Sequence, residues 1–382
     1  MISNVARLGL PLSPLRHLSR HLQLATHPGS TLRVSGSSCA NLVIKTNMET
    51  YEATVNADDS KGLESWATAA ESGDLNVVLP ASSGPTTVAI PASFNVSVDM
   101  ADACDVDVQG WLEGTVEVAV GEGKIGVGTV RGLLTKVSTS RGDVAIKHVE
   151  GNVDVTTGGG SVTLGKILAQ DVRVKASGEL HATALYSKVL RATAEGGMQS
   201  SVLSAEDGVL RLGGVSSLDS VEGEVAVEVL KDAQEVVLQA IEGCRKLSVA
   251  VGGDADAPAR PRVTVHVPEA FAARAEVISG KLTVDERIEA TTTVGGGGGG
   301  SGGDEAAGAS TVVQMGGGGK VRGEPRPWAD EPNASAAQCQ IAVGAPGCDV
   351  TLGQMSWMEQ RMKASMSKGA EARAQGRKRG AF

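Results

Sequence analysis

The sequence predicts an all-β protein that folds as a β-solenoid, a parallel β-helix-like stack of short strand–turn units. First, the pattern G-x-(V/I/L)-x-(V/I/L) recurs along the chain at a nearly constant interval, as at Gly142, Gly151 and Gly160. Second, the 382-residue chain contains 50 glycines but only four tryptophans, two tyrosines and three phenylalanines. Small aliphatic side chains must therefore fill the core, which suits a narrow interior lined by many short strands.

The clearest repeats lie between residues 114 and 164. Their leading glycines are Gly114, Gly123, Gly132, Gly142, Gly151 and Gly160. In the unit GNVDV (151–155), strand alternation points both valines inward and the Asn and Asp outward. Glycine at the corner permits backbone angles that other residues avoid. We expect each 9–10-residue unit to form one rung, paired with its neighbours at about 4.8 Å.

Two other all-β folds are less compatible with this pattern. An antiparallel sandwich would favour hairpin signals such as Asn-Gly between its strands, and the sequence contains no Asn-Gly. A membrane β-barrel needs strands of about 10 residues and girdles of aromatic side chains. The sequence also lacks an apolar run of about 18 residues, so we predict no transmembrane segment.

One repeat imitates a nucleotide-binding motif. Residues 121–126, GEGKIG, match the G-x-G-x-x-G pattern of a dinucleotide-binding loop. That loop requires a helix directly after it, because the helix N-terminus binds the pyrophosphate. The residues that follow, VGTVRGLLTKV, are rich in glycine and β-branched side chains, which disfavour a helix. We interpret the match as two repeats read out of frame and predict no cofactor.

The N-terminal segment, residues 1–30, has the composition of a targeting peptide. It contains arginine and serine but no acidic residue. A helix here would place leucines on one face, with Arg16 and Arg20 roughly opposite, as in an organelle presequence. We therefore predict a mitochondrial protein, with the chloroplast as the alternative address.

Composition divides the remainder of the chain. We expect the strand repeats to occupy residues 31–290. Residues 291–338 contain GGGGGGSGG and GGGG and are predicted to form a Gly-rich flexible linker. Residues 339–358 could form final strands, because alternation returns there. Residues 359–382 are expected to be a basic, disordered tail.

The charge is distributed unevenly along the chain. The whole sequence carries −9, whereas residues 1–48 and residues 356–382 carry +5 each, which leaves −19 for residues 49–355. An acidic body lacks the basic stripe that phosphate neutralisation requires. We therefore predict a protein partner of unknown identity and no nucleic-acid binding, with the oligomeric state open.

The cysteines give no recognisable site. The five are Cys39, Cys104, Cys244, Cys339 and Cys348. An odd number without a C-x-x-C motif argues against a disulfide framework and against a metal site. We expect them to behave as small buried apolar residues in a reducing or mixed compartment.

Few other side chains are candidates for a site, and we predict no catalytic residues. Asp105 and Asp107 begin like a calcium loop, but Val116 stands where that loop requires Glu. They are weak metal candidates, and a solvated strand face is the simpler interpretation. Trp111 and Trp357 are candidate partner anchors, because tryptophan is enriched in binding hot spots. Packing at the ends of the solenoid is the alternative role for tryptophan.

These features together resemble a known family. The G-x-V-x-V rungs, the corners in TVAIPASF (87–94) and TVHVPEAF (264–271), and the segment AEVISGKLTVD (275–285) resemble the putative-adhesin family of β-strand-repeat domains of unknown function. The resemblance covers roughly residues 73–290 and is greatest to its eukaryotic, organelle-targeted branch. It implies a β-solenoid-like fold and no established catalytic residues.

The sequence therefore favours a non-catalytic binding or scaffold protein that presents an acidic solenoid surface in an organelle. Two alternatives stay open. One is an enzyme whose site is assembled across rungs, and the other is a structural spacer without a ligand. Acidic residues gathered in one groove would favour the enzyme.

Overall fold

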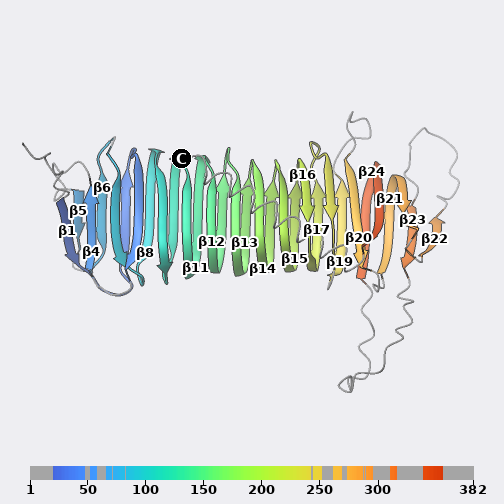
Figure 1. The fold of residues 1–382 in the computed structure, drawn as a ribbon, viewed down its shortest axis with the longest axis horizontal. Coiled ribbons are helices and arrows are strands. Elements are labelled where there is room, and N and C mark those ends of the chain that lie inside the picture. Colours follow the sequence, from blue (N-terminus) through green and yellow to red (C-terminus); the bar gives the residue numbers. More distant parts are fainter. Residues whose placement is uncertain are drawn as a thin grey trace, which may run out of the picture.

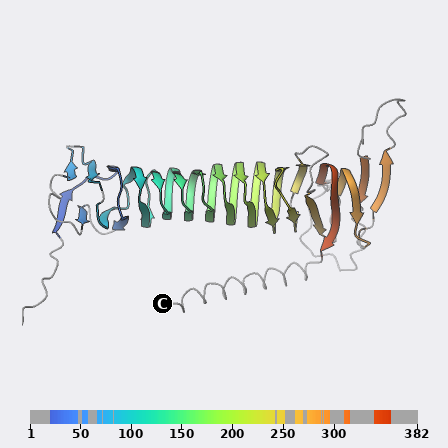
Figure 2. The same cartoon turned by 90° about the horizontal axis from the view of Figure 1, so that it is seen from above.

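The structure is a computed structural model that describes residues 20–47, 52–57, 66–70, 72–81, 83–241, 244–251, 261–268, 273–286, 288, 290–295, 310–315 and 339–355. These residues form one long, narrow stack of strands (Figure 1). Turned by 90°, the stack shows strands on both sides of a thin interior (Figure 2). The predicted all-β solenoid is confirmed.

The described residues contain 24 strands. The first twelve are β1 (Arg20–Ala25), β2 (Thr31–Gly36), β3 (Asn41–Asn47), β4 (Glu52–Ala57), β5 (Ala67–Ala69), β6 (Leu75–Leu79), β7 (Thr86–Pro91), β8 (Asn95–Ala103), β9 (Asp105–Leu112), β10 (Val116–Glu122), β11 (Ile125–Arg141) and β12 (Val144–Thr157). The others are β13 (Val162–Ala176), β14 (Glu179–Ala194), β15 (Gly197–Leu212), β16 (Val215–Leu218), β17 (Val221–Val229), β18 (Glu235–Leu238), β19 (Cys244–Val251), β20 (Arg262–Pro268), β21 (Ala273–Val284), β22 (Ala290–Gly295), β23 (Ser310–Met315) and β24 (Cys339–Met355).

One turn of the solenoid contains two sequence repeats, not one. Val144 pairs in parallel with Ile125 before it and with Val162 after it. The repeats that begin at Gly132 and Gly151 lie between these partners in sequence. Consecutive repeats therefore lie on opposite faces and do not pair with each other. The physical reason is that the inward side chains of one strand need an opposing strand to pack against. Each turn must therefore supply one strand to each face of the core.

We call the two rows of strands face A and face B. Face A contains β6, β2, β8, β10, the later parts of β11–β15, β17, β19 and the first part of β24. Face B contains β7, β3, β9, the first parts of β11–β15, β16, β18, β20 and the last part of β24. Corner 1 joins face A to face B within a turn, and corner 2 joins face B to the next turn.

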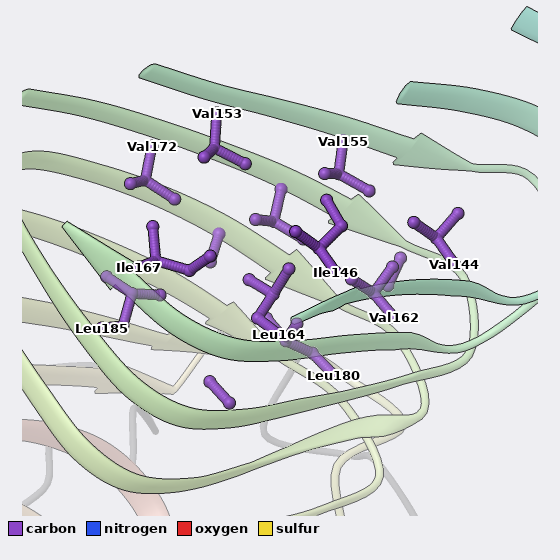
Figure 3. Close-up of a cluster of buried hydrophobic side chains, with 14 of the residues drawn as sticks. Val144, Ile146, Val153, Val155, Val162, Leu164, Ile167, Val172, Leu180 and Leu185 are labelled. Atoms are coloured by element: carbon purple, nitrogen blue, oxygen red, sulfur yellow. The ribbon is translucent and has the colours of Figure 1, made fainter. Parts of the chain in front are cut away.

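The core is a column of aliphatic side chains between the two faces. Ile146, Leu164 and their neighbours in Figure 3 come from successive turns and stack on one another inside the solenoid. Both are almost fully buried, at 1% and 0% exposure. Burying one such side chain contributes about 1.5–3 kcal/mol, so the stability is spread over every turn.

The repeat glycines at corner 1 are explained by contact between turns. Gly142 has a φ of 142°, a conformation that side chains with a Cβ rarely adopt. A Cβ on Gly160 would collide with the carbonyl oxygen of Gly142 in the preceding turn. Glycine therefore lets the backbones of successive turns approach closely at this corner.

We expect Gly160→Ala to lower the free energy of unfolding by about 1–3 kcal/mol, because the new methyl group has no room beside the Gly142 carbonyl. Urea unfolding followed by circular dichroism measures the effect. The matched control is Gly159→Ala, whose Cβ would make only ordinary contacts of 3.6 Å or more and should change stability by less than about 0.5 kcal/mol. Equal effects of the two substitutions would contradict the steric explanation.

The order of turns in space differs from the order in sequence at both ends. At the N-terminal end, β2 lies between β6 and β8, and β3 lies between β7 and β9. At the C-terminal end, β24 lies between β19 and β21 on one face and between β20 and β21 on the other. In Figure 1, the red-orange β24 therefore lies beside the yellow β19 and β20.

Antiparallel strands end the parallel stack. β1 and β4 pair antiparallel beyond β7, and β5 pairs antiparallel with β6. At the other end, β23 pairs antiparallel with β21 and β22 with β23. Trp66 packs against the core beside β5, so this tryptophan has the end-packing role. Strands of opposite direction thus lie beyond the parallel ladder at both ends.

Three strands lie in segments for which we expected no strand. β1 falls within residues 1–30, the predicted targeting peptide; β23 and all but the first residue of β22 fall within the predicted linker 291–338. The reason is local: residues 290–295 and 310–315 are ATTTVG and STVVQM, and both favour strands despite the glycine runs beside them. The basic tail, residues 359–382, lies outside the described residues.

The expectation of no disulfide was wrong. Cys39 and Cys104 are disulfide-bonded across a sequence separation of 65 residues. Cys39 lies at corner 1 between β2 and β3, and Cys104 lies at corner 1 between β8 and β9. These two turns are neighbours in space, which brings the Cα atoms to 4.8 Å. Sequence spacing could not reveal the pair, because the β2–β3 turn is stacked out of sequence order. Cys244 and Cys348 are buried, as expected.

We expect reduction of this disulfide to destabilise the protein by about 2–4 kcal/mol, because it releases the constraint on a long loop. Thermal unfolding with and without dithiothreitol measures the loss. The Cys39→Ala/Cys104→Ala double variant should unfold at a lower temperature and should not respond to dithiothreitol. A dithiothreitol effect of the same size in the double variant would show that the disulfide is not responsible.

Candidate functional site

A groove with a volume of about 810 Å³ runs along corner 2. Its floor is made of one small residue from each of six successive turns. These residues are Gly132, Gly151, Ala169, Ser187, Ala205 and Gly223. The parallel register aligns Ala169, Ser187 and Ala205 directly with one another. The groove forms because the residues at the corner itself have small side chains, whereas the residues on either side of them have larger ones.

The two rims of the groove differ in chemistry. One rim consists of residues in continuous parallel register: Arg131, Glu150, Leu168, Tyr186, Ser204 and Glu222. The other rim is polar and consists of Asn152, Gln170, Lys188 and Glu206. Turns are about 4.8 Å apart, so the floor from Gly132 to Gly223 is about 24 Å long.

The groove exposes large apolar side chains at its N-terminal end, where Leu133 lies, and in its middle, where Leu168 and Tyr186 lie. Leu133 is 85% exposed, Leu168 36% and Tyr186 37%. All three line the groove, whereas the other large exposed apolar residues in the described chain, Val78 and Val215, do not. Apolar side chains clustered in a concave surface and bordered by polar residues are typical of a binding site.

A connected set of side chains lies at the N-terminal end of the rim that contains Leu168 and Tyr186. The Arg131 guanidinium lies over the Trp111 ring, 4.2 Å from its centroid. Arg131 Nε also donates to Glu150 Oε2 at 2.8 Å, and His148 Nε2 lies 3.2 Å from Glu150 Oε1. The Trp111 Nε1 atom is shielded from solvent and has no hydrogen-bond partner among the described residues. Trp111 is therefore half-buried beneath Arg131 and supports the rim.

The pKa of the Glu150 carboxyl is lowered from its ordinary value, first by the hydrogen bond to His148 and then by the charge of Arg131. Glu150 consequently remains ionised over a wider pH range. The stabilisation from this contact is present at neutral pH and is lost as the pH falls through the lowered pKa. Because the Glu150 carboxylate is exposed, its ion pair contributes little stability and serves mainly to orient Arg131 over Trp111.

Charged residues occupy the C-terminal end of the groove. Glu206, Glu222, Lys188 and Arg245 line it there, two acids with two bases. Arg245 Nε lies 3.9 Å from Glu224 Oε1, at the margin of an ion pair. The groove is thus apolar from its N-terminal end to its middle and charged at its C-terminal end.

The predicted acidic residues have structural partners. Asp105 Oδ1 accepts a hydrogen bond from the Lys124 backbone N–H at 2.8 Å, which connects two turns. Asp107 Oδ2 accepts one from Gln109 Nε2 at 2.6 Å. Asn95 and Asp143 make contacts like that of Asp105 with the next turn. Within the described residues, no group of three potential metal ligands gathers anywhere.

Of the two predicted partner anchors, Trp111 lies beside the groove and Trp357 lies outside the described residues. Sequence reasoning missed the apolar rim. A signal was present, because Leu168 and Tyr186 occupy equivalent positions two repeats apart and Tyr186 is one of only two tyrosines. Recognising this signal required knowing that one turn contains two repeats, because only then do equivalent positions two repeats apart lie side by side.

Opposite charges on the solenoid pair between successive turns. Arg191 pairs with Asp207 at 2.6 Å and Arg211 with Glu228 at 2.8 Å, each between successive turns. The pKa of Asp207 is lowered, chiefly by its hydrogen bond from Arg191. Exposed pairs of this kind contribute little stability each, typically below about 1 kcal/mol.

Neither a protein-family model nor a curated protein matches the chain. A solved structure from Clostridium sporogenes, described as a "putative cell adhesion protein", is similar over 88% of this chain and 100% of its own, at 9% sequence identity. The TM-score is 0.17, so this likeness carries no argument about function. Membership of an organelle-targeted adhesin-like branch stays a prediction.

Within the part of the chain that the structure describes, no helix has the length and apolar character needed to cross a membrane.

We expect His148→Phe to raise the pKa of Glu150, because the substitution removes the largest contact that favours the ionised carboxyl. Carboxyl ¹³C chemical shifts, recorded through an acid titration, measure the change. Asp207 is the internal control, since its pKa depends on Arg191 and should not move. An unchanged Glu150 midpoint in the variant would show that His148 does not govern this group.

Proposed function

We propose that this chain is a non-catalytic binding protein whose solenoid presents the corner 2 groove to a protein partner. The exposed apolar side chains of Leu133, Leu168 and Tyr186, all of which line the groove, are the observation that carries the proposal. Exposing these side chains costs free energy that a bound partner would recover. The rigid stack of turns supports the groove on both sides, so the surface needs little rearrangement to bind.

The shape of the groove suits an extended or helical segment of a partner. A floor about 24 Å long accommodates roughly seven residues of extended chain or 16 residues of helix. Leucine and tyrosine in the middle would contact apolar side chains of that segment. Glu206, Glu222, Lys188 and Arg245 at one end would fix its direction by charge.

The proposed setting is an organelle, the mitochondrion or alternatively the chloroplast, as the composition of residues 1–30 suggests. The Cys39–Cys104 disulfide adds the requirement that this setting be oxidising, since reducing compartments keep thiols free. The net charge of −19 over residues 49–355 would favour a basic partner.

We expect Tyr186→Asp to reduce partner capture at least tenfold, because it places a charge in the apolar middle of the groove. The measurement is affinity purification of the tagged full chain from fractionated cells, with quantitative mass spectrometry at low and high salt. Val215→Asp is the matched control, since Val215 is 51% exposed but lies at corner 1.

A partner that is retained by wild type and Val215→Asp but lost with Tyr186→Asp would support the proposal. Loss at high salt would add the predicted contribution of exposed charges, which salt screens. Equal capture by wild type and Tyr186→Asp would reject the groove as the binding surface. Circular dichroism of each variant establishes that the fold is intact.

A further inference from the structure

The last strand of the solenoid ends at the same corner as the groove. Leu352 of β24 is in register with Val265, and β18, β16 and β15 continue that row through Leu238 and Leu218 to Ser200. Met355 lies three residues after Leu352, and Leu203 lies three residues after Ser200. Met355 therefore occupies the same position in its turn as Leu203 does in the β15 turn. Ser204, the next residue after Leu203, belongs to the groove rim. The chain after Met355 thus starts at corner 2, in line with the groove.

The segment that follows is long enough to reach the groove. Met355 lies four turns from the Ser204 turn and five from the Tyr186 turn, or about 19 and 24 Å along the stack. Residues 356–382 number 27 and span about 40 Å as a helix and about 90 Å when extended. Either conformation passes the whole apolar rim.

The chemistry of the segment complements that of the groove and the solenoid. Its first part carries large apolar side chains, Trp357, Met358, Met362 and Met366, among charged and polar ones. The three methionines are evenly spaced and share one side of the chain in a helix or a strand. Methionine adapts to irregular apolar surfaces such as a rim of leucine and tyrosine. The segment carries a net charge of +5, whereas residues 49–355 carry −19. The two acidic and two basic residues that line the groove cancel one another.

We propose that residues 356–382 bind in the corner 2 groove of their own chain and cover Leu168 and Tyr186 until a partner displaces them. The inference rests on the proposed function, in that the groove is the same surface. It adds regulation: the partner must compete with a tethered segment whose effective concentration is high. Apolar contact holds the segment in the groove, and net charge draws it to the solenoid.

Photo-cross-linking in the full-length chain tests this without any partner. Tyr186 is replaced by p-benzoylphenylalanine, another aromatic residue, and cross-linked peptides are identified by mass spectrometry. Isotopically light and heavy chains are mixed, so that contacts within one chain are distinguished from contacts between chains. The same photoreactive residue at Val215, on corner 1, is the positional control.

We expect cross-links from position 186 to residues 356–382 of the same chain, and at least tenfold fewer from position 215. Met362→Glu should lower the yield at position 186 at least tenfold by placing a charge on the apolar side of the segment. Ser367→Glu is the matched control, because it adds the same charge on the opposite side and should leave at least half the yield.

Three results would overturn the proposal. Cross-links between light and heavy chains would show that a second copy occupies the groove. Equal yields from positions 186 and 215 would show that the segment contacts the solenoid without preference. Cross-links from position 186 that never include residues 356–382 would show that the segment lies elsewhere. None of these results depends on partner capture, so failure here is distinct from failure of the proposed function.

Discussion

Parallel pairing of each turn with the next is the constraint on which the rest of this structure depends. Val144 pairs with Ile125 and with Val162, two repeats away on either side, and the other middle turns repeat that relation. The backbone of each turn makes its ladder hydrogen bonds with the turns on either side, so no turn is stable alone. Side chains must therefore fit between turns only about 4.8 Å apart, and this limit decides what can occupy each corner.

Both corners meet this limit with small residues and with side chains that bind the next turn. At corner 1, glycine allows the backbone at Gly160 to lie against the Gly142 carbonyl, and aspartate side chains such as Asp105 bind the next turn. At corner 2, small residues such as Ala169 and Ala205 form a floor, and larger neighbours stand as rims. The groove is thus a product of the same stacking that stabilises the fold. Its apolar middle, at Leu168 and Tyr186, is not required by that stacking, which is why it points to binding.

The ends of the solenoid show how non-local pairing completes the fold. The β2–β3 turn and the β24 turn each insert between turns that are distant from them in sequence. The Cys39–Cys104 disulfide joins the first of these turns to its neighbour. Antiparallel strands lie beyond the inserted turns and end the parallel ladder. The insertion of β24 also brings Met355 to corner 2, in line with the groove.

The sequence by itself determined the class of fold, the spacing of the strands and which side chains of the regular repeats point inward. Units such as GNVDV show these features because alternation and glycine corners are local properties of the backbone. Only the tertiary structure decided that two repeats make a turn, that Cys39 meets Cys104, and that Leu168 and Tyr186 share a rim. These depend on which strands pair across long stretches of sequence, and local periodicity is the same for every such pairing.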